Sequence, residues 1–526
     1  MSPAIQRVAA AGPRAIIVDV ESSGHARALS AHLVEHPAAG QIDLVAGERS
    51  VLLLLERGGL VEAAVDDIGA IRDLAPRADE GRLIELPTAY DGEDLAPLAD
   101  SLGMSAEAVV RWHSEQSWTA AFSGFTPGFA YLEAGAQVLP VPRRAVPRTI
   151  VPPGSVAVAD RFSGVYPRAS PGGWQLIGRT SAVMWNSDRN PPALVAPGDR
   201  VRFVAVRDET HLPAPAEVDD PTAPTPEDEI GTSRAVEVID PGLQTLVQDR
   251  GRRGLQHRSV STSGAADAYS YLAGNELVGN APDAAALEIA YGGAEFVARG
   301  QLVLALTGAD VEARITSVRG ANKAAPLWAP FVVDDGTRLE LGAPTAGIRT
   351  YLCVRGGILA SPELGSRSTD ILAGLGPRPA RRGDLYAIGH AHGGPVGRRV
   401  PPAEMPNATT VTPLEIDPGP RAHLFTPTSR RLLLESRWTI TGDANRVGVR
   451  LEGESPLTLT RPRELPSEGI MPGSIQVPPS GMPMVFLRDH PATGGYPLIG
   501  IVRSAALNRL AQLPPGSAVQ FVLGGD

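Results

Sequence analysis

The sequence PGSVAV at residues 153–158 opens a series of short blocks that recurs later in the chain. The first copy consists of PGSVAV (153–158), GGWQLIG (172–178), SA (181–182) and PGDRVRFV (197–204). The second copy consists of PGSIQV (472–477), GGYPLIG (494–500), SA (504–505) and PGSAVQFV (515–522). Short apolar runs bounded by turn residues are typical of β-strands, and blocks repeated in one order indicate a duplication. We therefore expect two related β-barrel lobes that pack as a pseudo-symmetric pair.

The two copies differ beside their Gly-Gly turns. The second copy has Asp489, His490, Thr493 and Gln476 where the first has Pro167, Arg168, Pro171 and Ala157. Glycines let a backbone approach a ligand closely and direct N–H groups at an oxyanion, but a barrel turn can also need them for positive φ. Both interpretations remain open for Gly172–Gly173, with Ser170 beside them, and for Gly494–Gly495, with Tyr496 after them.

Composition restricts the class of protein. Gly and Pro, with 57 and 49 of 526 residues, make up about a fifth of the chain, against an average of about 12%. This favours many turns and short strands over a bundle of long helices. The formal charge of −10 gives no basic footprint for nucleic acid, and no apolar run approaches the roughly 18 residues of a membrane span. With no continuous apolar segment near the N-terminus and one cysteine, Cys353, we expect a cytoplasmic protein without disulfides.

The single lysine, Lys323, excludes several mechanisms. It does not follow a glycine, so it forms no phosphate-binding Gly-Lys-Ser/Thr loop, and it has no neighbouring methionine of a biotin carrier. The Gly/Ser-rich loops of a Ser-Lys amidase and a Gly-x-Ser-x-Gly nucleophile motif are also missing. No Cys or His pattern predicts a metal site.

The organisation along the chain is mainly β with α+β parts. Helical spacing at 26–34 and 61–74, with apolar strands at 49–55 and 83–86, predicts a small α/β sandwich. A stretch with five prolines among acidic residues predicts a disordered linker. The expected units are an α/β domain (1–87), a barrel (88–210), the linker (211–234), a first C-terminal lobe (235–412) and a second, barrel lobe (413–526).

Three groups of residues are candidates for chemistry. Asp489 and Asp249 are candidate catalytic carboxylates, and His113, at the end of an amphipathic helix, is a candidate acid–base group or a structural histidine. Arginine clamps carboxylates and phosphates, and hydroxyls and turn N–H groups assist it. The candidate anion-binding residues are Arg252, Ser366, Arg367, Ser170, Gly172, Gly173, Gln476, Thr493, Gly494, Gly495 and Tyr496. The stretch 365–370 (GSRSTD) either binds an anion or caps a helix expected at 370–375.

Several longer motifs resemble one family. The motifs are FTPGFAYL (125–132), PRRAVPR (142–148), PGLQT (241–245), QDRGR (248–252), AGNELVGN (273–280) and GSRSTD (365–370). The first half is similar to the "allophanate hydrolase subunit 1" family, which includes KipI and the B-type subunit of bacterial 5-oxoprolinase. The second half is similar to the "allophanate hydrolase subunit 2" family, which includes KipA and the C-type subunit of the same enzyme. The chain therefore resembles a fusion of the two.

The resemblance implies duplicated cyclophilin-like barrels and three possible functions. The first is ATP-dependent hydrolysis of 5-oxoproline to glutamate, with ATP and Mg bound in a complex with a separate A-type subunit. The second is carboxyl transfer in a biotin-dependent urea or amide carboxylase, with biotin carried on another chain. The third is regulation of a sensor histidine kinase, as for KipI and KipA. We expect a small acid or amide as the ligand, and a homo-oligomer is possible.

Overall fold

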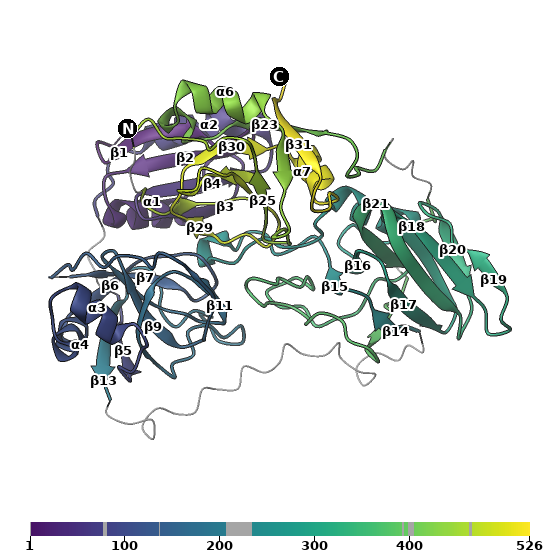
Figure 1. Cartoon of the computed structure of the whole chain (residues 1–526), viewed down its shortest axis with the longest axis horizontal. Coiled ribbons are helices and arrows are strands. Elements are labelled where there is room, and N and C mark those ends of the chain that lie inside the picture. Colours follow the sequence, from purple (N-terminus) through teal and green to yellow (C-terminus); the bar gives the residue numbers. More distant parts are fainter. Residues whose placement is uncertain are drawn as a thin grey trace.

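A computed structural model of the chain describes residues 2–76, 81–135, 137–206, 234–391, 394–397, 404–461 and 465–525. It contains an N-terminal α/β domain, a first barrel, a central domain (residues 234–391) and a second barrel (Figure 1). The expected linker at 211–234 lies, except for its last residue, outside the described residues. Within these ranges no helix has both the length and the apolarity to cross a membrane.

The N-terminal domain is an antiparallel sheet in the order β1-β2-β4-β3. Its elements are β1 (Ile5–Ala10), β2 (Ala15–Val20), α1 (Ser23–Glu35), β3 (Gln41–Ala46), β4 (Ser50–Leu55) and α2 (Val61–Ala70). Leu53 on β4 faces the core shared with α1 and α2, whereas Leu52 faces Ala492 and Met471 of the second barrel. Because β4 is covered on both faces, it is a continuous apolar run and not an alternating strand.

The first barrel contains seven strands in the order β12-β9-β10-β7-β6-β13-β5. They are β5 (Leu83–Thr88), β6 (Trp118–Ser123), β7 (Ala130–Ala134), β9 (Ser155–Ala159), β10 (Phe162–Val165), β12 (Gln175–Arg179) and β13 (Arg200–Ala205). β5 pairs in parallel with β13, from Leu83 opposite Arg200 onward. The assignment of residues 83–86 to the N-terminal unit was therefore wrong, because this strand completes the barrel instead.

The second barrel repeats this topology. Its strands are β23 (Thr412–Pro418), β24 (Trp438–Ile440), β25 (Gly448–Glu452), β27 (Ser474–Gln476), β28 (Met484–Phe486), β30 (Leu498–Val502) and β31 (Ala518–Leu523). They form a closed barrel in the order β23-β30-β27-β28-β25-β24-β31. Started at β30 and followed round to β23, this is the order of the first barrel strand for strand, with β30 in the place of β12 and β23 in the place of β5. Trp118 Nε1 donates to the His113 carbonyl, and Trp438 Nε1 donates to the Leu433 carbonyl in the same way. The predicted duplication of barrels is confirmed.

Each barrel also has a two-stranded ribbon that carries its Gly-Gly turn. In the first barrel β8 (Arg148–Val151) pairs with β11 (Ser170–Gly172), and in the second β26 (Glu468–Gly469) pairs with β29 (Thr493–Gly494). The diverged residues that the sequence pointed to therefore occupy equivalent places on the two barrels.

The central domain is a nine-stranded sheet built around two long antiparallel strands, β18 (Leu302–Thr316) and β21 (Arg338–Val354). The other strands are β14 (Ala235–Pro241), β15 (Gln244–Gln248), β16 (Ala286–Ala290), β17 (Ala294–Arg299), β19 (Asn322–Ala324), β20 (Pro330–Val333) and β22 (Leu385–Ala387). Helix α5 (Ala268–Leu277) packs on β18 and β21. Its N-terminus is capped by Asp267, which accepts from Tyr269 N and Ser270 N.

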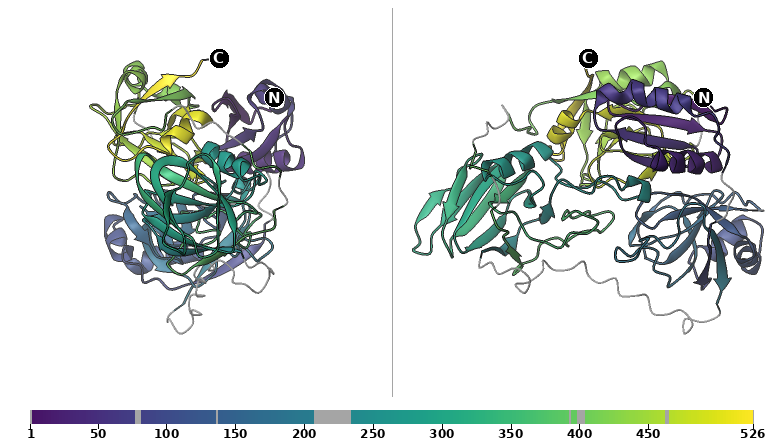
Figure 2. Two further views of the ribbon diagram at one scale, coloured as in Figure 1. Left: turned by 90° about the vertical axis from the view of Figure 1, so that its right-hand side faces the viewer. Right: turned by 180° about the vertical axis from the view of Figure 1, so that it is seen from behind.

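The two units from opposite ends of the chain lie side by side. The N-terminal domain lies beside the second barrel, and the first barrel and the central domain lie below them on opposite sides (Figures 1 and 2). Arg421 joins the two upper units, because it donates to Asp19 on β2 at 2.5 and 2.7 Å and to Glu468 on β26 at 2.7 Å. Burial raises the pKa of Glu468 to about 7, while Arg421 opposes that shift.

Candidate functional site

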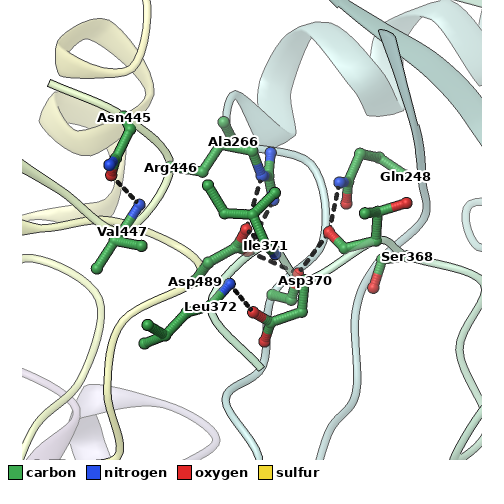
Figure 3. A network of polar contacts seen from close by, with 12 residues as sticks. Gln248, Ala266, Ser368, Asp370, Ile371, Leu372, Asn445, Arg446, Val447 and Asp489 are labelled. Atoms are coloured by element: carbon green, nitrogen blue, oxygen red, sulfur yellow. Dashed lines mark hydrogen bonds and ion pairs between the residues drawn. The ribbon is translucent and has the colours of Figure 1, made fainter. Parts of the chain in front are cut away.

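Five of the predicted site residues meet in one buried polar network, which we call the junction network, between the central domain and the second barrel. Figure 3 shows the part of this network around Asp489 and Arg446. The five residues are Asp249, Arg252, Ser366, Arg367 and Asp489. The first two follow β15, the next two lie in the long loop before β22, and Asp489 follows β28. Segments far apart in sequence therefore converge in this network.

Asp249 organises the loop that carries Ser366 and Arg367. Its Oδ1 accepts from Ser366 Oγ at 2.6 Å and from Gly251 N at 2.7 Å, and its Oδ2 accepts from Arg367 N at 2.6 Å. The carboxylate is buried. Its hydrogen bonds to loop backbone and hydroxyl groups fix the shape of the loop, as is expected of a positioning residue.

Arg252 clamps the same loop from inside. Its two terminal nitrogens donate to Ser368 Oγ at 3.1 Å and Ser368 O at 2.8 Å, and its Nε donates to Glu363 O at 3.2 Å. The side chain is 1% exposed, and burial lowers its pKa from the ordinary value. The guanidinium therefore binds oxygens of the protein itself.

Asp489 forms one end of a buried ion-pair chain in which Arg446 lies between Asp489 and Glu288. Arg446 donates to Asp489 through Nε at 2.9 Å and a terminal nitrogen at 3.0 Å, and to Glu288 at 2.5 Å. All three side chains are at most 3% exposed. Burial opposes ionisation of Glu288, but Arg446 and Arg349 outweigh it and lower its pKa. Asp489 and Arg446 belong to the second barrel and Glu288 to the central domain, so the chain of charges joins the two units.

Asp370 brings a further carboxyl group into the junction network. Its Oδ1 accepts from Leu372 N at 3.0 Å and Ala373 N at 2.8 Å, and Oδ2 accepts from Ser261 Oγ (Figure 3). Burial, and then the negative charge of Asp489, raise its pKa. Residues 371–374 form a turn and not the expected helix, so the helix prediction was wrong, and Asp370 caps this turn.

The first barrel reaches this loop from the other side. Arg168, the counterpart of His490, donates to the carbonyl of Gly374. Ser187 donates to the Glu363 carboxylate, which also accepts from Gly376 N at 2.5 Å. The loop between Glu363 and Gly376 belongs to the central domain, and both the first barrel and the second barrel contact it.

The second-barrel Gly-Gly turn lies apart from the junction network, against the first barrel. Thr493 Oγ1 accepts from Phe125 N at 3.1 Å, and Ala492 N donates to Phe125 O at 3.1 Å. Gln476 Nε2 donates to the Tyr496 carbonyl at 3.1 Å. A Cβ on Gly494 would lie 2.6 Å from Gln476 Nε2, so close approach, and not positive φ, requires glycine there.

The first-barrel turn packs against the aromatic face of its own barrel. Gly172 lies against the ring of Tyr166, and the Gly173 carbonyl accepts from Arg144 N at 2.9 Å. Burial raises the pKa of Tyr131, whose hydroxyl also bonds to Thr493. Tyr131 therefore ties the first barrel to the second-barrel turn. The nearby Ser170 is buried.

His113 does not join either group. Its ring lies in the core of the first barrel, with Nδ1 2.8 Å from the Tyr90 hydroxyl and Nε2 2.7 Å from Ser163 Oγ. The ring centroid of Phe203 is 4.3 Å away, and burial lowers the pKa of the imidazole to about 3. Of the two interpretations of this residue, the contacts favour the structural one.

Glu288 and Arg446 of the junction network were not singled out from the sequence, whereas Ser368 and Asp370 lie in the stretch 365–370 that was. Glu288 had a signal, because it is the one charge in the apolar run 284–290. No feature of the sequence pointed to Arg446, since its partners Asp489 and Glu288 lie 43 and 158 residues away. Across the described ranges, no cluster of three or more His, Cys, Asp or Glu residues could hold a metal ion.

Comparison with known proteins identifies the class. Models of the carboxyltransferase domain match residues 6–195, as subdomains C and D, and residues 258–523, as subdomains A and B. The chain belongs to this carboxyltransferase-domain family.

Particular relatives correspond to the two halves. The C-type subunit of 5-oxoprolinase from Escherichia coli (strain K12) is 37% identical over 292 residues, which cover 55% of this chain and 90% of that protein. The B-type subunit of 5-oxoprolinase from Escherichia coli O157:H7 is 48% identical over 128 residues, 24% of this chain and 59% of that protein. A crystal structure of the protein TTHA0988 has a TM-score of 0.82 at 33% identity and covers 97% of this chain and all of its own. The family resemblance drawn from the motifs is confirmed.

Proposed function

We propose that this chain is the fused B–C component of an ATP-dependent 5-oxoprolinase, which converts 5-oxoproline to glutamate together with a separate A-type subunit. The observation that carries the proposal is that one chain contains regions 37% and 48% identical to proteins named as the C-type and B-type subunits of 5-oxoprolinase. The contacts between barrels support it, because Phe125 N donates to the Thr493 side chain and Phe125 O accepts from Ala492 N.

The chemistry explains why ATP is needed. A lactam is a stable amide, and its carbonyl carbon resists attack by water. Transfer of the terminal phosphoryl group of ATP to the lactam oxygen breaks the bond to ADP and forms a C–O–P link. Water then adds at that carbon and the C–N bond breaks, which leaves the free amine and an acyl phosphate. A second water displaces the phosphate and completes the carboxylate, so one lactam, one ATP and two waters give glutamate, ADP and phosphate, with protons moved by a general acid–base group. Since Lys323 forms no phosphate-binding loop, we assign MgATP to the A-type subunit.

In this proposal the junction network positions the parts of the site. Asp489 was predicted as a catalytic base, but it is fully buried and accepts two hydrogen bonds from Arg446. The oxygens of this carboxylate also accept from Ser263 Oγ and Ile371 N, so they are occupied by donors of the protein itself. We therefore propose that Asp489 and Asp249 act by fixing the second barrel and the 363–376 loop relative to each other.

The test is reconstitution. The purified chain is mixed with a candidate A-type subunit, ATP, Mg²⁺ and 5-oxoproline, and glutamate is measured with each component omitted in turn. We expect glutamate in the complete mixture only. Its absence with several A-type subunits, while the chain remains folded, would contradict the proposal.

Carboxyl transfer is the second candidate, favoured by the family's description as a carboxyltransferase domain. It requires a biotin carrier on another chain, because Lys323 lies exposed on β19 without the flanking methionine of a carrier. A parallel reaction with a biotin carboxylase, a biotinylated carrier, bicarbonate and urea tests it. Carboxylated product there, with no glutamate in the first reaction, would reverse the order of the two candidates.

A further inference from the structure

A cavity of about 530 Å³ lies where the N-terminal domain, the first barrel and the central domain meet. Its walls come from α1, from the end of β6, from the turn at 197–198 and from the short helix η3 (Gln256–Arg258). Its lining residues are different from those of the junction network. The volume falls within the range of small-molecule sites, roughly 300–1,000 Å³.

Hydrogen bonds hold the walls of the cavity together. Ser23 at the start of α1 donates to Glu133 of the first barrel at 2.9 Å. Asp43 on β3 accepts from Gln256 N at 2.9 Å, and its other oxygen lies 3.7 Å from His257 Nδ1. The three walls are therefore anchored to one another before any ligand binds, which reduces the entropic cost of binding.

The chemistry of the lining suits an anion with a small apolar body. The described lining residues include Arg27 and His257 but no carboxylate, and Arg258 Nε lies 3.2 Å from His257 Nε2. Arginine binds carboxylates through two parallel hydrogen bonds. Ser30 and Ser123 supply hydroxyls. Several of the remaining lining residues have small apolar side chains: Ala31, Ala46, Ala121 and Pro197.

We infer that this cavity binds a small organic carboxylate that also carries an amide or amine, with Arg27 as the anchor for the carboxylate. The choice of 5-oxoproline and glutamate as probes rests on the proposed function. Tighter binding of 5-oxoproline would indicate a site for the substrate, and tighter binding of glutamate would indicate a site for the product.

Calorimetric titration of the full chain alone tests the inference, with 5-oxoproline, glutamate and inorganic phosphate as probes. We expect one of the two carboxylates to bind, and Arg27→Gln to weaken it about tenfold or more. Ala31→Phe, which fills the cavity without removing a polar group, should also weaken it. The matched controls Arg111→Gln and Ala63→Phe change exposed residues on other helices and should bind as the original chain does.

Three results would overturn the inference: neither carboxylate binds, both cavity variants bind normally, or phosphate binds as well as the carboxylates. A second measurement needs no substitution. Diethyl pyrocarbonate modifies accessible imidazoles, so the ligand should protect His257 severalfold while the exposed His36 reacts unchanged. Equal modification of His257 with and without ligand would contradict the site.

These assays use neither the A-type subunit nor ATP. Glutamate formation in the reconstituted mixture without binding in this cavity would refute the inference and leave the proposed function in place. Binding in this cavity without glutamate formation in the reconstituted mixture would support the inference and contradict the proposed function.

Discussion

Replacement of Asp489 by asparagine should loosen the second barrel from the central domain. Asp489 accepts from Arg446 at 2.9 and 3.0 Å, from Ser263 Oγ at 2.7 Å and from Ile371 N at 3.1 Å. Asparagine keeps the shape but turns one acceptor into a donor that faces existing donors. Asp489 and Arg446 are 0% and 1% exposed, so water screens neither charge. Loss of one partner from a buried ion pair costs about 3–5 kcal/mol, and we expect about 3 because Glu288 still pairs with Arg446.

Hydrogen exchange followed by mass spectrometry is the appropriate assay, since a multidomain chain has no single free energy of unfolding. We expect peptides around 261–268 and 366–373 to exchange about a hundredfold faster in Asp489→Asn, which corresponds to about 3 kcal/mol. The matched control is Glu435→Gln, in an i,i+4 pair with Arg431 in which both side chains are about two-thirds exposed. That pair contributes about 0.3 kcal/mol, so its loss should leave exchange unchanged. Equal protection in the two variants would refute the account of the junction network.

Three further predictions concern other parts of the chain. Burial raises the pKa of Glu468 from 4.5 to about 7, so the folded chain binds this proton more tightly than the unfolded chain. The stability of the original chain should therefore fall as pH rises from about 4.5 to 7, and Glu468→Gln should remove that fall; parallel melting curves from pH 5 to 8 would contradict it. Gly494→Ala should lower the melting temperature because its Cβ would meet Gln476, whereas Gly59→Ala, with nothing within 4 Å, should not. Equal melting temperatures for the two variants would contradict this prediction. His113, whose pKa burial lowers to about 3, is neutral at pH 5–8, so His113→Gln should reduce stability yet leave the shape of the pH–activity profile unchanged; a shifted profile would restore a catalytic role.

The fold could be predicted where the signal is local or repeated. The blocks that begin at 153 and 472 define equivalent strands, and both barrels have the same strand order. The apolar run on β4 indicated a buried strand, and the structure adds the reason, a second barrel on its other face. β5 was misplaced because its neighbours in sequence belong to the N-terminal domain, whereas its pairing partner, β13, lies more than a hundred residues further on.

The junction network could be predicted only in part. Clustered polar residues identified Asp249, Arg252 and Ser366, because they lie within short motifs. The sequence could not show that their hydrogen-bonding capacity is used within the protein, since this depends on distant partners, such as Ser366 for Asp249 and Ser368 for Arg252. Glycine at 494 was identified as special, but the physical reason is the approach of Gln476 and not backbone conformation.

The most direct test of the proposed function is the ratio of ADP to glutamate formed when the chain, an A-type subunit, ATP and 5-oxoproline are combined. The account predicts one ADP for each glutamate, with both products absent when this chain is omitted. ADP release without glutamate, or glutamate formed equally well without this chain, would contradict it.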